Sequence, residues 1–470
     1  MESPRVASSP SQLEDRCARD ARRAALRLLA AVRRDDVYAN LQWPAVLERY
    51  GLTGRDAAFA TDLAYGTLRW SGFYDLVAAE VSSRPWTDVD PDIVDIVRLG
   101  VHQLLSMRVP DHAAVDSSCQ LARVVGITDE GRVGFINGLL RAVARRDRSQ
   151  WDEVVGRGKQ ADELAAAVTS HPRWVTEALH QALALHTQGE ISDEALCAAL
   201  LANNEPSRPT VAFLDDPPVL DAGLTPGRWS RRAATVDAGL PAKVEAVREG
   251  RAIVQDEGSQ LVVEALLAVP VSPPESAWLD MCAGPGGKAA VLASHARTQS
   301  VDFVAVELHA HRAALVESLL AAGVPEDSDV ALHILTADAC DRPWGSQFFD
   351  RILLDAPCTG LGALRRRPES RWRRNRDNVI ELAALQRRLL ATGLSSVRSG
   401  GVLAYVTCSP HIAETIDVVE EVLLHIDDVQ ILDAREFLPN VPDLGPGPHV
   451  QLWPHLHGTD AMHLTLMRRN

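Results

Sequence analysis

Apolar residues recur at three- and four-residue steps through the N-terminal part of the chain, the spacing of one face of an α-helix. The first such run comprises Ala21, Ala24, Ala25, Leu28, Leu29 and Val32. Further runs predict helices over residues 56–80, 91–107, 112–125 and 129–146. Residues 1–14 contain serine and proline without this periodicity, and we expect a flexible tail there. The pattern predicts an all-α domain over residues 15–148.

The pattern changes in the second half of the chain. Residues 149–257 predict connecting helices followed by a small α+β module with short β-prone pieces such as 210–213. From residue 258 to 470, apolar strand candidates alternate with helical stretches, at 277–282, 301–307, 331–335, 349–355 and 401–407. Such alternation is typical of a parallel sheet covered by helices on both faces. We therefore expect a multidomain protein in which an all-α domain precedes an α/β domain of the Rossmann-like type.

The composition is that of a soluble globular protein, with 46% hydrophobic and 24% charged residues. No apolar run is long enough to span a bilayer, and the N-terminus lacks a signal-peptide apolar block, so we expect a cytoplasmic protein that does not bind membranes. A net charge of −15 argues against nucleic-acid binding through overall charge. Locally, however, the segment 365–376 carries seven arginines and one acid, Glu369, which fits either a solvated loop or a nucleic-acid contact.

The seven cysteines are scattered, odd in number and without a CxxC pair. This distribution argues against a disulfide framework and against a zinc site, and we expect reduced thiols. The two HxH pairs, His309 with His311 and His455 with His457, lack a third ligand at suitable spacing. We expect no metal.

A glycine-rich turn follows the strand candidate 277–282, and we call it the glycine turn. It comprises Cys282, Ala283, Gly284, Pro285, Gly286, Gly287 and Lys288. In a doubly wound sheet such a turn lets backbone approach a ligand at the carboxyl ends of the strands. The spacing does not fit a triphosphate-binding P-loop. The next two strand candidates end at or just before an acid. Glu307 could accept hydrogen bonds from ribose hydroxyls, and Asp338 could face an adenine amino group. Together with the glycine turn, these strand ends predict a nucleoside-cofactor site.

Two cysteines follow the last two parallel strand candidates, Cys358 after Asp355 and Cys408 after Thr407. Both would emerge at the same sheet edge as the glycine turn. Carbon 5 of cytosine accepts a methyl group from a sulfonium only after a nucleophile has added to carbon 6, and its proton must then be removed by a base. Cys408, Cys358 and Asp355 could supply the nucleophile, the base and a group that steadies the ring nitrogens.

The chain resembles the 16S ribosomal RNA cytosine-5 methyltransferases of the RsmB/Sun/Fmu type from about residue 18 onward. The helical part carries the motifs Ala64-Tyr65-Gly66-Thr67-Leu68-Arg69, Asp111-His112-Ala113-Ala114-Val115 and Phe135-Ile136-Asn137-Gly138-Leu139-Leu140-Arg141. These are similar to the family's NusB-like RNA-binding domain. Val254-Gln255-Asp256-Glu257-Gly258-Ser259-Gln260 is similar to the family's entry into its catalytic domain.

The resemblance implies a role for each motif residue. Cys408 would attack the base and Cys358 would promote release. S-adenosyl-L-methionine would be the cofactor, held by the glycine turn, Glu307, Asp338 and Asp355. RNA contact would fall on Arg365, Arg366, Arg367, Arg371, Trp372 and Arg373. The chain departs from the family pattern at Gly284, Pro410 and Ala461-Met462-His463, the last of which replaces an aromatic stretch.

The expected substrate is an unpaired cytosine of 16S rRNA, which costs least to turn out of its stack, and the expected state is a monomer. Two alternatives remain open at this point. Cytosine-5 methylation of transfer RNA would use the same two cysteines. A non-catalytic RNA-binding or antitermination protein would use the NusB-like domain alone.

Overall fold

The computed structural model describes residues 10–214, 220, 222–237, 241–321, 330–346 and 348–470, with side chains from residue 20 onward. These residues form two compact units. The N-terminal unit runs to Thr176 and includes Arg366–Arg373, and the C-terminal unit comprises Glu177–Arg365 and Arg374–Asn470. Residues 1–9 of the expected tail lie outside the described residues, and the first helix begins at Pro10 rather than at residue 15.

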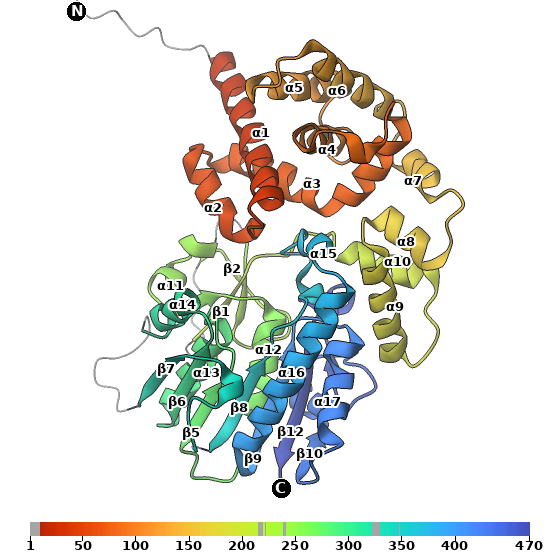
Figure 1. Ribbon diagram of the computed structural model, residues 1–470. Coiled ribbons are helices and arrows are strands. Elements are labelled where there is room, and N and C mark those ends of the chain that lie inside the picture. Colours follow the sequence, from red (N-terminus) through yellow and green to blue (C-terminus); the bar gives the residue numbers. More distant parts are fainter. Residues whose placement is uncertain (1–9, 215–219, 221, 238–240, 322–329, 347) are drawn as a thin grey trace, which may run out of the picture. The chain divides into compact units, whose positions relative to one another are not determined.

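The N-terminal unit is built from helices (Figure 1). They are α1 (Pro10–Arg34), α2 (Ala39–Arg49), α3 (Gly54–Val81), α4 (Pro91–Leu105), α5 (Asp111–Val124), α6 (Glu130–Val143), α7 (Arg148–Gly156), α8 (Ala161–Thr169) and the start of α9 (Arg173–Thr187). The predicted helices at 56–80, 91–107, 112–125 and 129–146 are confirmed as α3 to α6. Asp90 caps α4 by accepting a hydrogen bond from the Asp92 N–H, which is the expected role of an acid at this position.

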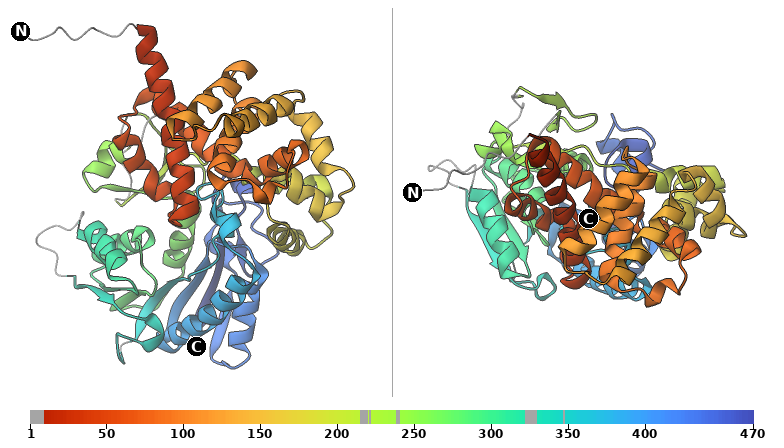
Figure 2. Two further views of the ribbon diagram at one scale, coloured as in Figure 1. Left: turned by 45° about the horizontal axis from the view of Figure 1, so that its top comes forward. Right: turned by 90° about the horizontal axis from the view of Figure 1, so that it is seen from above.

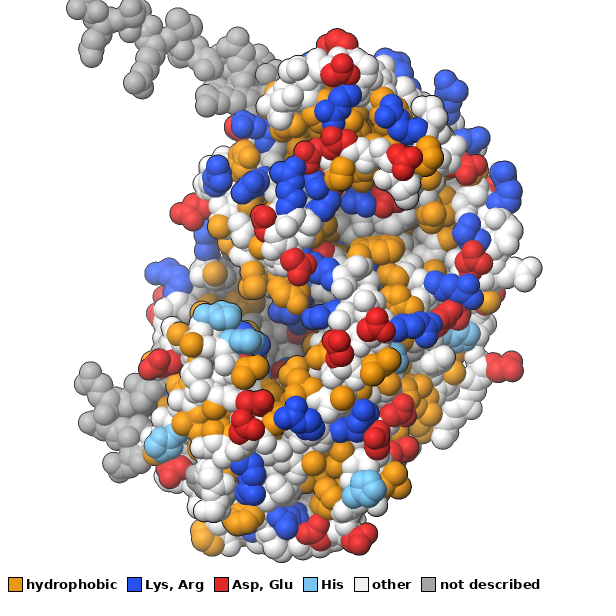
Figure 3. Space-filling view, in the orientation of Figure 1, with side chains coloured by type: hydrophobic (Ala, Val, Ile, Leu, Met, Phe, Trp, Pro, Cys, Tyr) orange, Lys and Arg blue, Asp and Glu red, His pale blue; other side chains and the backbone are white. Residues whose placement is uncertain are grey.

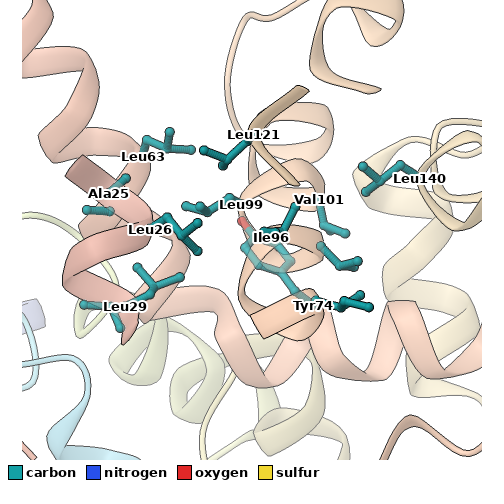
Figure 4. Packing of buried hydrophobic residues seen from close by; sticks show 14 of the residues in the cluster. Ala25, Leu26, Leu29, Leu63, Tyr74, Ile96, Leu99, Val101, Leu121 and Leu140 are labelled. Carbon is teal, nitrogen blue, oxygen red and sulfur yellow. The ribbon is translucent and has the colours of Figure 1, made fainter. Parts of the chain in front are cut away.

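Apolar side chains of α1, α3, α4, α5 and α6 interdigitate in one core (Figure 4). Members of this core include Leu26, Leu29, Leu63, Tyr74, Ile96, Leu99, Leu121 and Leu140. Gly66 explains one of the sequence motifs, because a Cβ there would lie 2.2 Å from Cε1 of His102. The buried His102 ring in turn hydrogen-bonds through Nδ1 to the Tyr74 hydroxyl at 2.7 Å. The motif glycine therefore admits a polar pair into the core.

The C-terminal unit begins with the rest of α9, α10 (Asp193–Ala202) and a small antiparallel sheet. Its strands are β1 (Thr210–Phe213), β2 (Leu224–Pro226), β3 (Ala233–Val236) and β4 (Ala252–Val254), in the order β2-β3-β1-β4. Helix α11 (Glu245–Arg248) packs on this sheet. The sequence correctly predicts a small α+β module in this stretch.

The main sheet has the strand order β10-β12-β9-β8-β5-β6-β7, and β11 pairs with β12. The strands are β5 (Ala277–Asp280), β6 (Asp302–Glu307), β7 (Leu332–Thr336), β8 (Phe349–Asp355), β9 (Val397–Thr407), β10 (Val429–Leu432), β11 (Val450–Gln451) and β12 (His463–Arg469). Strands β7, β6, β5, β8 and β9 are parallel, whereas β12 is antiparallel to both β9 and β10. Strand order reverses between β5 and β8, and ligands bind at such switch points in open α/β sheets.

Helices cover the sheet: α12 (Glu257–Ala268), α13 (Gly287–Thr298), α14 (Ala310–Ala321), α16 (Arg376–Ser396), α17 (Ile416–Leu423) and the short α18 (Pro454–His457). Helix α16 lies against β8 and β9, as the second view shows (Figure 2). All five predicted strands are confirmed. The antiparallel strands β10, β11 and β12 were not among the predictions. Strands β10 and β11 are short and carry a weak periodic signal, whereas β12 is longer and lies between β9 and β10. Among the described residues, no helix is both long and apolar enough to cross a membrane.

Candidate active site at the carboxyl edge of the sheet

The glycine turn joins β5 to α13 and is held by backbone hydrogen bonds to both neighbouring strands. Met281 N–H donates to the Leu353 carbonyl of β8 and Ala283 N–H to the Val306 carbonyl of β6, each at 2.9 Å. Gly286 takes φ of 114°, a conformation that favours glycine, and no side chain caps the N-terminus of α13. The first amides of that helix are thus available to an anionic ligand group.

Glu307, at the end of β6, is buried and bound to the turn. Its Oε2 accepts a hydrogen bond from Gly284 N–H at 3.1 Å, and its Oε1 accepts one from His309 N–H at 3.0 Å. A Cβ on Gly284 would lie 2.1 Å from Glu307 Oε2, so the glycine that departs from the family pattern permits this close approach. Asp338 follows β7, and its Oδ1 accepts from Cys340 N–H at 2.9 Å. The structure therefore brings both predicted strand-end acids to the same edge as the turn.

Two further polar groups at this edge were not predicted. Asp280 ends β5 with 1% of its surface exposed, and its Oδ1 accepts from Cys282 N–H at 3.2 Å. Burial, and secondarily the charge of Asp355, raises the pKa of Asp280 to about 8. Among the described residues, neither Asp280 Oδ2 nor Oε1 of Gln255 has a hydrogen-bond partner, although both atoms are buried. Because buried polar groups are normally satisfied, these two oxygens mark a place where a polar ligand group can bind.

An ion pair links the glycine turn to the next strand. Lys288 Nζ donates to Asp355 Oδ2 at 2.8 Å, with 12% and 26% of the two side chains exposed. Burial lowers the pKa of Lys288, but the charge and hydrogen bond of Asp355, together with the charges of Cys408 and Asp280, make the net shift upward. Lys288 is therefore a fixed cation at the end of β8, one strand away from β9.

Cys358 and Cys408 meet at this edge, with 3.4 Å between their Sγ atoms. A sulfur–sulfur distance of this size fits a hydrogen bond between one thiol and the other sulfur. The hydrogen bond from Cys358 lowers the pKa of Cys408, and the Lys288 cation lowers it further against the opposing effect of burial. The same hydrogen bond, burial and the carboxylates of Glu414 and Asp355 raise the pKa of Cys358. The surroundings thus favour a thiolate at 408 and a thiol at 358.

Backbone contacts fix the loops that carry the two thiols. Gly362 N–H donates to the Cys408 carbonyl, and Ala461 N–H donates to the Gly362 carbonyl, both at 2.9 Å. A Cβ on Gly362 would lie 2.1 Å from the Ala461 carbonyl oxygen. The stretch at residue 461 that departs from the family pattern therefore packs directly on the thiol loops through its backbone.

The predicted RNA-contacting residues have different environments. Arg365 donates from Nη1 to the Gly458 carbonyl at 2.6 Å, and Arg371 donates to the Ser170 carbonyl at 3.1 Å. Both side chains are buried, in contrast to the prediction of RNA contact. These guanidinium groups satisfy backbone carbonyls of residues remote in sequence, a use that local sequence does not reveal.

The remaining members of this segment lie closer to the surface. Arg373 donates to the Val32 carbonyl at 3.2 Å, and its guanidinium and that of Arg367 lie over the ring of Tyr38. Trp372 has 45% of its surface exposed, and Arg366 is partly exposed. Segment 366–373 is thus partly a structural element of the N-terminal unit and partly a surface.

Lys and Arg side chains also gather on the face of the N-terminal unit seen in Figure 3. In helix α1, Arg23, Arg27 and Arg34 are exposed at four- and seven-residue steps, which places them on one side of the helix. This row was not identified from the sequence, because the same run of residues carries the apolar face that dominates the pattern.

Among the described residues, the other sulfur and imidazole groups form neither a disulfide nor a metal-ligand cluster. Cys119, Cys197, Cys282 and Cys340 are free thiols, as are Cys358 and Cys408. The side chain of Cys17 lies outside the described residues. The rings of His309 and His311 stack at 5.7 Å, but the part of the chain described here holds no group of three metal-ligating side chains.

Comparisons with known proteins match both parts of the chain. Residues 268–468 match the family described as 16S rRNA methyltransferase RsmB/F, and residues 19–145 match the NusB family. The Mycobacterium tuberculosis (strain H37Rv) protein Rv1407, which its name calls a methyltransferase, is 45% identical over 461 residues, covering 96% of each chain. Ribosomal RNA small subunit methyltransferase B of Pseudomonas putida is 31% identical over 422 residues, covering 88% of this chain and 91% of its own.

One solved structure, that of PH0851, resembles the whole chain. Its TM-score is 0.75 at 19% identity, and the match covers 99% of this chain and 100% of the other. At this identity the likeness shows the fold alone, an α/β sheet preceded by helices. Together with the sequence matches, it establishes that this chain belongs to the RsmB/F family of 16S rRNA methyltransferases and is an S-adenosylmethionine-dependent RNA methyltransferase with a NusB-like domain.

Proposed function

We propose that this enzyme methylates carbon 5 of an unpaired cytosine in 16S rRNA through a covalent bond between Cys408 and carbon 6 of the base. The observation that carries the proposal is the 3.4 Å approach of the Cys358 and Cys408 sulfur atoms beside the Lys288–Asp355 pair. Cytosine-5 methylation needs a nucleophile and a base on one ring, whereas methylation of an exocyclic nitrogen needs neither thiol.

The residues at the carboxyl ends of β5, β6 and β7 fit S-adenosylmethionine. The uncapped amides at the start of α13 suit its carboxylate, and the unpartnered oxygens of Asp280 and Gln255 suit its amino group. Glu307 has carboxylate oxygens that can accept from ribose hydroxyls, and Asp338 is the candidate for the adenine amino group. The bound cofactor supplies the methyl group.

Cys408 begins the reaction as a thiolate, because the Cys358 hydrogen bond and the Lys288 charge lower its pKa. Its sulfur adds to carbon 6, so a sulfur–carbon bond forms and the ring electrons move toward carbon 5 and nitrogen 3. The Asp355 carboxylate, held by Lys288, can accept a hydrogen bond from the protonated nitrogen 3 or from the exocyclic amine of the base.

Cys358 then acts in release. Its pKa is raised first by the hydrogen bond with the Cys408 sulfur, and this cause disappears once Cys408 is a thioether. Cys358 can then pass its proton to water and take the proton from the methylated carbon 5. The carbon–hydrogen electrons re-form the carbon 5–carbon 6 double bond, the sulfur–carbon bond breaks, and the Cys408 thiolate is regenerated.

We infer that RNA is held by the exposed arginines Arg23, Arg27 and Arg34 of α1 and by Arg366, Arg367 and Trp372, since phosphate contacts need exposed cations and an exposed aromatic ring can stack on a base. The similarity to relatives such as the small subunit methyltransferase B of Pseudomonas putida supports a ribosomal target. We further propose that the enzyme acts in the cytoplasm, where a ribosomal substrate would lie, and as a monomer.

Trapping tests the chemistry. Cys358→Ala should accumulate a covalent protein–RNA adduct visible on denaturing gels, whereas Cys408→Ala should give neither adduct nor product. An adduct that persists in the Cys408 variant would reverse the roles. Bisulfite sequencing of rRNA and tRNA from a deletion strain identifies the substrate, and a methylcytosine lost from tRNA alone would replace the ribosomal assignment. Absence of label from tritiated S-adenosylmethionine in any RNA would leave only an RNA-binding role.

A further inference from the structure

A buried carboxylate lies directly behind the thiol pair. Glu414, in the short 3₁₀ turn Ile412–Glu414 after β9, has 0% of its surface exposed. Its Oε1 accepts a hydrogen bond from Thr359 N–H at 2.7 Å. Its Oε2 accepts from the hydroxyls of Thr359 and, at 2.7 Å, Ser409. Since Thr359 follows Cys358 and Ser409 follows Cys408 in the chain, one carboxylate joins the two thiol loops.

A second layer of polar groups holds this carboxylate and the other side of the Cys358 loop. The Gln386 side chain donates to the carbonyl of Pro357, the residue before Cys358, at 2.8 Å and lies 3.4 Å from Glu414 Oε1. The Tyr405 hydroxyl donates to the Glu414 carbonyl at 2.7 Å. All three side chains are fully buried. The Cys358 loop is therefore fixed on both sides of the thiol.

Burial of Glu414 carries a large cost in free energy. Moving a carboxylate out of water is tolerated only when hydrogen bonds or a cation compensate. Among the described residues, no lysine, arginine or histidine forms a salt bridge with Glu414, so its compensation comes from the neutral donors of Thr359, Ser409 and Gln386. An apolar residue could fill the same space at lower cost, so packing alone does not account for a carboxylate here.

We infer that Glu414 is a positioning residue that holds the Cys358 thiol in hydrogen-bonding distance of the Cys408 sulfur, an inference that rests on the proposed cytosine-5 chemistry. It does not touch substrate, because no part of it is exposed. Its charge also opposes ionisation of Cys358 and so keeps that sulfur a hydrogen-bond donor. The thiol pair would thus depend on a residue that belongs to neither cysteine motif.

The test measures the reactivity of Cys408 in the full-length protein without any RNA. Iodoacetamide labelling of Cys408, followed by peptide mass spectrometry, gives a rate against pH whose midpoint reports the Cys408 pKa. Glu414→Gln replaces one carboxylate oxygen by an amide NH₂ group, which cannot accept, so one of the hydrogen bonds from Thr359 and Ser409 is lost and the two thiol loops separate. The midpoint of the labelling profile should then rise by about one pH unit, and labelling at neutral pH should fall about tenfold. In a Cys358→Ala background, Glu414→Gln should produce no further shift.

Matched variants distinguish a positioning role of Glu414 from a general loss of structure. Glu420→Gln changes an exposed carboxylate in the neighbouring helix α17 and should leave the pH profile unchanged. Thr359→Val removes one hydroxyl donor and should shift the profile in the same direction, whereas Thr359→Ser keeps the hydroxyl and should restore it. If Glu414→Gln does not fold, the two Thr359 variants test the positioning role instead.

Methyl transfer provides the second readout. Glu414→Gln should lower kcat about 100-fold while KM for RNA stays within about threefold, because the residue acts on the thiols and not on RNA binding. A folded Glu414→Gln or Thr359→Val protein with the wild-type pH profile and kcat overturns the inference. A shifted profile in a protein whose wild type forms no 5-methylcytosine supports the positioning role and refutes the proposed reaction instead.

Discussion

The glycine turn and the thiol pair lie at the ends of neighbouring strands of one sheet, but different parts of the chain build them. The glycine turn is contiguous, and backbone hydrogen bonds from Ala283 and from the preceding Met281 to the Val306 and Leu353 carbonyls hold it. The thiol pair joins residues 50 positions apart, and side chains of Thr359, Ser409 and Glu414 hold it. A site held by backbone hydrogen bonds tolerates changes of its side chains, but a Cβ added at one of its glycines disturbs it. A site held by a network of side chains fails when one member is removed.

The largest expected effect is on the thiol side. Cys408→Ser should reduce methyl transfer at least about 10³-fold, because an oxygen nucleophile at neutral pH is almost fully protonated and adds poorly to carbon 6. Tritium transfer from S-adenosylmethionine to RNA measures the rate. Cys197→Ser, in α10 and outside both thiol loops, is the matched control and should stay within about twofold of wild type. Undiminished turnover in Cys408→Ser would refute the covalent scheme.

The second largest effect should come from adding a methyl group to the glycine turn. In Gly286→Ala the new Cβ would lie 2.9 Å from Leu319 Cδ1 at a φ of +114°. The strain should displace the start of α13 and weaken S-adenosylmethionine binding about tenfold, measured by calorimetry. Gly138→Ala in α6 meets no atom within 4 Å and should leave binding unchanged. Equal affinity in both variants would show that the glycine turn does not hold the cofactor.

The third prediction concerns pH. The pKa of Cys408 is lowered first by the Cys358 hydrogen bond and then by Lys288, so the thiolate persists to lower pH than an ordinary thiol allows. Lys288→Met should move the midpoint of Cys408 alkylation upward, with a several-fold lower rate at pH 7. Exposed Lys243→Met serves as the control. A midpoint unchanged by Lys288→Met would assign the whole shift to the other thiol.

The smallest effect concerns stability without cofactor. Asp280 has its pKa raised from 3.8 to about 8 by burial and by Asp355, so the native state keeps a proton that the unfolded state has lost between these values. Stability should therefore fall as pH rises from about 4 to 8. Asp280→Asn should remove this loss and raise Tm at pH 8 by about 2–4 °C. Exposed Asp427→Asn should retain the wild-type pH dependence, and an unchanged slope in Asp280→Asn would place the titrating group elsewhere.

How much of the site was predictable from the sequence depended on whether its residues carry a local signal. The strand before the glycine turn, the turn itself and Glu307 were predictable, because local apolar runs and a glycine cluster are contiguous signals. Cys358 and Cys408 were predictable because each follows a strand of the same parallel sheet. Asp280 carried a comparable signal, an acid at the end of an apolar strand, and was not used. Glu414 had no such signal, since an acid in a polar loop is most often solvated.

The arginine segment shows the opposite limit. A run of cations predicts an exposed surface, yet Arg365 and Arg371 are buried and bind the carbonyls of Gly458 and Ser170. Both carbonyls belong to residues remote in sequence, one about 90 residues after Arg365 and the other about 200 before Arg371. Charge density alone therefore does not distinguish an RNA-binding surface from internal hydrogen bonding.

The sequence alone determined the helical N-terminal domain, the parallel sheet, the edge of that sheet where chemistry is possible and the candidate nucleophile. These features depend on periodicity and strand order, which are local properties. Only the tertiary structure decided which thiol has a lowered pKa, which arginines reach the surface and which carboxylate joins the two thiol loops. Each of these depends on desolvation and on distances between residues far apart in the chain, and neither quantity is present in a linear pattern.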